Sequence, residues 1–162
     1  MKEEMKEKGY KQGYEVEEME VPADLSDDAK AAFEEGYQEG LKKRQEEVTQ
    51  EGFDAAFKKE TYELPDTYDE GSKQEDWFKK GFESNTEAAP LREEAFQQGK
   101  AGKKMTIPEE WAENEAAAAM FERHYVKGKE ERAERNRLLI MGGIAAAAVV
   151  VVVVWVLVRR EK

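Results

Sequence analysis

Side chains able to do chemistry are few in this sequence. His124 is the only histidine and there is no cysteine, which excludes disulfides, thiolate nucleophiles, zinc–thiolate sites and cysteine-ligated iron–sulfur clusters within the chain. His124 takes the place that Gly36 and Gly81 have in related segments, so we interpret it as a structural substitution rather than a base or a ligand. No serine or threonine lies in a nucleophile motif, and no phosphate-cradling loop is present.

Only the stretch DTYDEG at 66–71 resembles a cation site. With Gly71 as the sixth residue of a calcium loop, the third position is Tyr68 and the twelfth is Trp77, so the required ligand pattern fails. The many Asp and Glu residues are then best interpreted as a solvated charged face. We therefore expect no enzymatic activity, no cofactor and no metal site.

Glycine followed by an aromatic residue is the feature that most needs a structural reason. Glycine costs roughly 1 kcal/mol in a helix interior relative to alanine, so its recurrence suggests that another helix backbone approaches it closely. That helix belongs either to the same chain, which we favour, or to a partner. The candidate packing and partner residues are Tyr10, Tyr14, Gly36, Tyr37, Gly52, Phe53, Phe78, Gly81, Phe82, Phe121 and Tyr125.

The sequence repeats itself with a period of about 43 residues, as helical arrays do. Leading aromatic residues and apolar–proline pairs both recur at this spacing. They are Tyr10, Phe53 and Phe96, and Val21-Pro22, Leu64-Pro65 and Ile107-Pro108. In such arrays no single unit buries its apolar face alone. We predict an all-α fold with three helical-hairpin units at about 9–51, 52–94 and 95–130.

Each unit is expected to run helix, short connector, helix. Proline favours the first turn of a helix and pushes the preceding residue out of the helical region, so each proline should begin the second helix of its unit. An apolar stripe from Leu25 to Phe57 predicts one helix of about 35 residues, or two helices hinged near Gly52. Pro90 interrupts the equivalent stretch of the second unit, where we expect a kink or a split.

The segment from Gly36 to Phe57, GYQEGLKKRQEEVTQEGFDAAF, resembles the Gly-x-x-x helical repeats of adaptor proteins in cytosolic iron–sulfur cluster delivery. The residues that match that family's pattern GYxxGxxxG…QxGFxxGF are Gly36, Tyr37, Gly40, Gln50, Gly52, Phe53 and Phe57. Arg44 and Ala56 stand where the pattern has further glycines. The resemblance implies a helical adaptor.

A second resemblance is to ribosome modulation factor, whose pattern is GYxxG, a central proline and then WxxGW. The segment 9–13, Pro22 and the segment 33–37 follow this order, and the second unit echoes it. That family is basic and binds ribosomal RNA, whereas this chain is acidic. The resemblance implies an alternative function as a membrane-tethered ribosome- or RNA-associated factor.

Residues 138–158, LLIMGGIAAAAVVVVVVWVLV, form an uncharged apolar run. A helix rises about 1.5 Å per residue, so this run is long enough to span a hydrocarbon core of roughly 30 Å. We predict a transmembrane helix here, preceded by a basic juxtamembrane segment at 131–137 and followed by a basic tail at 159–162. The residues expected at the membrane interface are Arg135, Arg137, Trp155, Arg159 and Arg160.

Charge is divided unevenly along the chain. Residues 1–126 contain 18 Lys/Arg and 33 Asp/Glu, a net −15, whereas residues 127–162 contain 8 and 4, a net +4. The anionic body disfavours nucleic-acid binding and suits a protein partner with a basic surface. The start of the sequence has no apolar stretch that could serve as a signal peptide, so we expect the N-terminal domain in the cytoplasm and the tail across the membrane.

These patterns predict a non-enzymatic, tail-anchored, single-pass membrane scaffold or adaptor, with an acidic helical repeat domain at 1–130 that faces a protein partner. A structural membrane component of a larger assembly belongs to the same interpretation. Membrane lipid is an expected partner. Gly142 and Gly143 would allow a homo-oligomer through the transmembrane helix.

Overall fold

A computed structural model describes residues 1–16 and 18–160, with side chains described as far as Met141. Over these residues the chain forms six α-helices and no strand, so the all-α prediction is confirmed. The helices fall into two compact units, residues 1–88 and residues 89–162.

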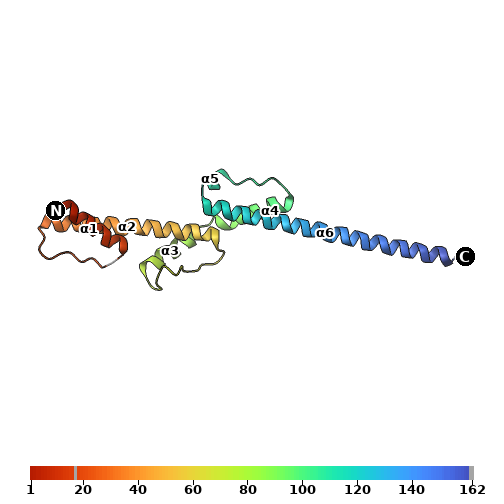
Figure 1. Ribbon diagram of the computed structural model, residues 1–162, viewed down its shortest axis with the longest axis horizontal. Helices are drawn as coiled ribbons and strands as arrows, with labels where there is room; N and C mark the ends of the chain where they lie inside the picture. The colour runs from red at the N-terminus through yellow and green to blue at the C-terminus, as the bar shows by residue number, and fades with distance from the viewer. Residues whose placement is uncertain (17, 161–162) are drawn as a thin grey trace. The chain divides into compact units, whose positions relative to one another are not determined.

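The first unit contains α1 (Lys2–Glu15), α2 (Asp27–Lys58) and α3 (Lys73–Ser84). α1 packs on the N-terminal half of α2 and α3 on its C-terminal half (Figure 1). The long α2 therefore takes part in two helix pairs. It is one continuous helix through Gly52, so of the two predicted alternatives the single helix is confirmed and the hinge near Gly52 is wrong.

The paired helices of the first unit run in the same direction. Gly9 of α1 lies against Phe33 of α2, and Gly13 against Tyr37, so the contacts advance along both helices together. Crossover loops that include residues 18–26 and 59–72 carry the chain back to the start of the next helix (Figure 1). The predicted hairpin geometry is wrong, because the units are parallel helix pairs with long connections.

The second unit repeats this arrangement with α4 (Ala88–Ala101), which begins at the unit boundary, and α6 (Glu115–Arg160). A crossover loop at 102–114 contains the short α5 (Glu109–Ala112) and returns the chain so that α6 runs parallel to α4 (Figure 1). α3 ends at Ser84 before α4 begins, so the stretch interrupted by Pro90 is split.

Polar side chains cap three of the six described helices, α3, α4 and α6, whereas among the repeated prolines only Pro108 directly precedes a helix, the short α5. Ser72 Oγ accepts a hydrogen bond from the Glu75 N–H at 3.1 Å, and Asn114 Oδ1 accepts one from the Ala117 N–H at 2.9 Å. Such caps satisfy N–H groups that have no partner inside the helix. Pro22 and Pro65 lie earlier, within the crossover loops, so the prediction that they start helices is wrong.

The predicted transmembrane helix at 138–158 is corrected by the structure. In the part of the chain that the structure describes, no helix combines the length and the apolar character needed to cross a membrane. α6 is long, but its described side chains end at Met141 and include the charged stretch 127–137. They supply only four residues of the predicted span, Leu138–Met141, whereas a hydrocarbon core requires about 20 consecutive apolar residues.

The predictions that depended on this helix are wrong with it. They are the single-pass, tail-anchored class and the membrane localisation with a cytoplasmic N-terminal domain. The side chains of residues 142–158, of Arg159 and Arg160, and the whole of residues 161–162 lie outside the described residues, and the predicted interface residue Trp155 is among them.

Candidate functional site

The glycines singled out in the sequence lie where two helix backbones touch. A Cβ added to Gly36 would lie 2.0 Å from the carbonyl oxygen of Lys6, and one added to Gly9 would lie 2.0 Å from that of Phe33. Gly52 and Gly81 face each other in the same way, against the carbonyl oxygens of Phe78 and Thr49. No side chain fits in these spaces, so glycine is required there.

All these contacts follow one reciprocal rule. Each glycine lies against the carbonyl oxygen of the residue three positions before the glycine on the opposite helix. In the first unit the glycine pairs are Gly9 with Gly36, Gly13 with Gly40, and Gly52 with Gly81. In the second unit the pair is Gly99 with Gly128. Contacts of this kind bring Cα–H groups against carbonyl oxygens and let two backbones approach closely.

The predicted aromatic residues are divided among these pairs and do not form one site. Tyr37, Phe78 and Phe121 are buried in three different places, with 6%, 3% and 0% of their surface exposed. Phe82 meets Tyr62 edge to face, with ring centroids 5.7 Å apart, and Phe53 meets Phe57 in the same way at 5.8 Å. These rings are packing residues of the helix pairs.

Tyr10 and Tyr14 remain as the predicted aromatic residues on an open face of α1. Their rings stack with centroids 6.1 Å apart. They line a shallow groove of about 450 Å³. The other residues that line it are Glu4, Glu7, Lys8 and Lys11. Tyr10 is 38% exposed, so this groove is the part of the predicted set that a partner could reach.

Arg44, which replaces a glycine of the resembled pattern, organises a polar network in the first unit. Its guanidinium carbon lies 5.6 Å from the ring centroid of Tyr14 on α1 and 5.9 Å from that of Tyr68 in the second crossover loop. Its Nη1 lies 3.8 Å from Glu47 and 4.0 Å from Glu51. This Arg44 network ties α1, α2 and the loop together, and no local sequence pattern had indicated it.

Titration in the Arg44 network is shifted in directions that follow from its contacts. Tyr14 Oη donates to Glu47 Oε2 at 2.6 Å, which lowers the pKa of Glu47 and raises the pKa of the Tyr14 phenol. Burial, and then a hydrogen bond donated to Glu51, raises the pKa of Tyr68 to about 12. The network therefore holds both phenols neutral and the Glu47 carboxylate charged at neutral pH.

The charges of the two units differ in balance. Residues 1–88 contain 13 Lys/Arg and 26 Asp/Glu, a net −13, whereas residues 89–162 contain 13 and 11, a net +2. Among the described side chains none that is charged or polar is buried, so the charges of the described residues lie on the surface. Nor do the described residues place three or more His, Asp or Glu side chains where they could hold a metal ion.

No protein-family model, curated protein or solved structure matches this chain. The two resemblances seen in the sequence therefore stay predictions. The surface chemistry and the helix-pair geometry carry the functional argument.

Proposed function

We propose that this protein is a non-enzymatic helical scaffold or adaptor whose first unit presents an acidic surface to a basic surface of a protein partner. The observation that carries the proposal is the composition of the first crossover loop. Glu18, Glu20 and Asp24 are exposed there, and residues 18–26 contain no lysine or arginine.

The second crossover loop adds to this surface. Its exposed carboxylates are Glu60, Glu63, Asp66, Asp69 and Glu70, and its one cation, Lys59, forms an ion pair with Glu63. Both loops are joined at each end to helices that pack through backbone contacts. Clustered charge of one sign accelerates association with an oppositely charged surface and selects against partners of like charge.

Charge-neutral variants of the first loop test the proposal. The full chain is crosslinked at low salt to the proteins that bind it, and these proteins are recovered and identified. The triple variant Glu18→Gln/Glu20→Gln/Asp24→Asn should no longer recover them. A matched control, Glu15→Gln/Glu34→Gln/Glu83→Gln, removes the same charge from exposed helical positions and should keep them. Equal recovery with both triples would contradict an acidic docking loop.

Ribosome co-sedimentation separates this function from the predicted alternative. The full chain is centrifuged with ribosomes across a salt series. The proposal expects the chain to stay in the supernatant, because an anionic surface is repelled by phosphate backbones. Pelleting that weakens steeply as salt rises would favour a ribosome- or RNA-associated factor and overturn the scaffold.

A further inference from the structure

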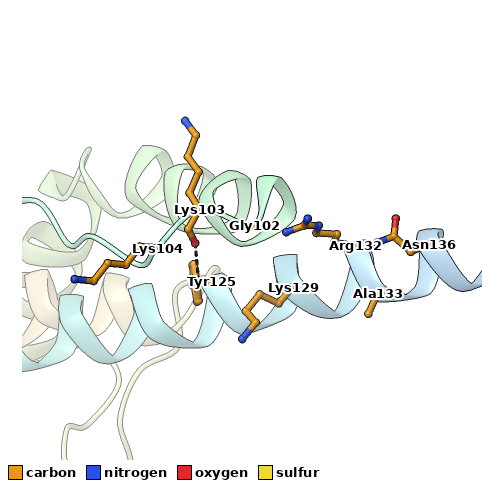
Figure 2. A pocket seen from close by; sticks show the side chains of 8 residues that line it. All are labelled: Gly102, Lys103, Lys104, Tyr125, Lys129, Arg132, Ala133 and Asn136. Atoms are coloured by element: carbon orange, nitrogen blue, oxygen red, sulfur yellow. Dashed lines mark hydrogen bonds between the residues drawn. The ribbon is translucent and has the colours of Figure 1, made fainter.

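A cationic groove lies in the second unit, where the crossover loop leaves α4 and passes beside α6 (Figure 2). Its volume is about 490 Å³. Its lining includes Gly102, Lys103, Lys104, Tyr125, Lys129 and Arg132. Four of them are cationic, and no acidic residue lines the groove.

What sets these four cations apart is that they lie together in a groove without an acidic side chain in its lining. Elsewhere Lys6 contacts Glu35 at 3.0 Å and Glu39 at 2.8 Å, and Lys100 on α4 contacts Glu131 at 2.6 Å. Within the described residues, no cation of the groove forms an ion pair. Acidic residues outnumber basic ones 37 to 26, so four neighbouring cations without a carboxylate need a separate explanation.

The dipole at the C-terminus of α4 explains only two of the four cations in the groove. Lys103 and Lys104 follow the C-terminus of α4, where positive charge complements the helix dipole. Lys129 and Arg132 lie in the interior of α6 and are three residues apart, which places them on one face of the helix. The helix dipole gives no reason for cations at those two positions.

The loop that borders the groove is firmly held. The N–H groups of Gly102 and Lys103 donate to the carbonyl oxygens of Gly99 and Gln98 at 2.9 Å and 3.0 Å, which closes the end of α4. Tyr125 Oη donates to the Lys103 carbonyl oxygen at 2.7 Å and so ties the loop to α6. Two fixed backbone segments thus carry the four cations.

Arg132 occupies space that only glycine leaves open at this point. Gly102 has φ +69°, and a Cβ there would fall on the Arg132 guanidinium. Figure 2 shows Arg132 directed toward Gly102, while the ammonium groups of Lys103, Lys104 and Lys129 point in different directions. The guanidinium thus lies directly beside the loop at Gly102. Lys129 Nζ lies 5.9 Å from the Tyr125 ring centroid, and the lysines are long side chains able to turn toward a charged ligand.

We propose that the cationic groove binds a small anion with two or more adjacent phosphate groups. A guanidinium donates to phosphate oxygens in a bidentate fork, and lysines act as point charges around them. The net charge of −11 on the chain disfavours long polyanions, whereas a compact anion meets mainly the four nearby cations. A short polyphosphate therefore fits better than a nucleic acid strand. This ligand site is independent of the acidic docking loops.

Calorimetric titration of the full chain with tripolyphosphate tests the site. The variant Lys129→Gln/Arg132→Gln is expected to bind at least about tenfold more weakly, because it removes two of the four charges and the guanidinium fork. The control Lys127→Gln/Arg135→Gln removes the same charge from exposed positions of the same helix outside the groove. It should bind within about twofold of the parent chain.

A third variant keeps the charge and removes the fork. Arg132→Lys should bind about threefold more weakly, since lysine cannot donate in a bidentate manner, and circular dichroism should show the helical content of the parent. Absence of saturable binding up to about 1 mM would overturn the proposal. Equal weakening by both double variants, or tighter binding of a single-stranded RNA oligonucleotide than of tripolyphosphate, would overturn it as well.

Discussion

The α1/α2 pair and the α4/α6 pair use the same backbone contact in different amounts. We call each reciprocal pair of facing glycines one level of contact. Four glycines hold α1 against α2 at two levels, whereas Gly99 and Gly128 hold α4 against α6 at one level. The other level of the second pair falls at Ala95 and His124, which stand where the first pair has Gly9 and Gly36. One glycine level is thus enough to bring two helix backbones together, and a second level is an addition.

The two pairs also differ at the residue that ends the first helix. α1 is followed by Val16, which has φ 61°, and α4 by Gly102, which has φ 69°. These positions are 86 residues apart, two periods of the repeat. A β-branched residue in the left-handed region is strained, and glycine is not. The same chain reversal is therefore costly in the first unit and relaxed in the second.

The largest effect is expected from closing a glycine contact. Gly99→Ala and Gly13→Ala each push a Cβ to 2.0 Å from a carbonyl oxygen of the facing helix. We expect each to cost about 3 kcal/mol in the free energy of unfolding, measured with urea, because backbone cannot move aside as a side chain can. Hydrogen exchange should show α4 losing more protection in Gly99→Ala than α1 does in Gly13→Ala.

Gly71 provides the control for that experiment. It has positive φ but no atom within 4 Å of an added Cβ. Gly71→Asn should change stability by less than about 0.5 kcal/mol, since asparagine tolerates this conformation. An equal loss at Gly71 and Gly99 would mean that the close helix contact is not the cause.

Exchanging the residue types that follow α1 and α4 should change the free energy of unfolding by a smaller amount, with opposite signs at the two positions. Val16→Gly should raise the free energy of unfolding by about 1 kcal/mol, and Gly102→Val should lower it by about 1–2 kcal/mol, because left-handed backbone is costly for residues other than glycine. Thermal unfolding of both variants measures the difference. Destabilisation by Val16→Gly would show that Val16 contributes more through packing than it costs through strain.

The Arg44 network distinguishes the first unit from the second and can be broken at one hydroxyl. Tyr14→Phe removes the hydrogen bond to Glu47 and should lower the urea midpoint of unfolding, because a hydrogen bond to a charged acceptor is lost. Tyr10→Phe is the matched control on the same helix, and it should leave the urea midpoint unchanged. Similar losses in both variants would show that the network does not stabilise the pair.

Alkaline titration gives a weaker but specific signature of the same network. Because the pKa of Tyr68 is raised to about 12 in the folded chain, above the value of about 10 for a free phenol, its stabilisation is complete below pH 10 and is lost as pH rises through 12. Ultraviolet absorbance should show a late-titrating phenol that Tyr68→Phe removes. A titration curve that Tyr68→Phe leaves unchanged above pH 11 would contradict the shift.

Much of the helical content and the glycine positions could be predicted from the sequence. Glycine beside an aromatic in a helical stretch requires a close neighbour, and Gly36, Gly52 and Gly81 have one. The direction of pairing could not be predicted, because a local pattern is the same for a hairpin and for a parallel pair. Crossover loops of ten or more residues make the parallel arrangement possible. The prediction that each proline starts a helix makes the predicted connectors too short.

The Arg44 network and the cationic groove could not be predicted from the sequence for a related reason. Both bring together residues from separate elements, such as Tyr14 with Tyr68 and Lys103 with Arg132. Neither set has a characteristic spacing along the chain. By contrast, the acidic character of the first unit is a matter of composition and could be seen at once.

Spin-label distances test the parallel glycine-packed pair most directly. The chain has no native cysteine, so cysteines introduced at the exposed positions Glu3, Ala31 and Lys42 can be labelled selectively. Labels at 3 and 42 should be farther apart than labels at 3 and 31 by roughly 10 Å, because the rise of about 1.5 Å per residue along α2 adds at right angles to an interhelical separation of about 8–10 Å. The reverse order, with 3 closer to 42 than to 31, would mean an antiparallel hairpin and would contradict the account.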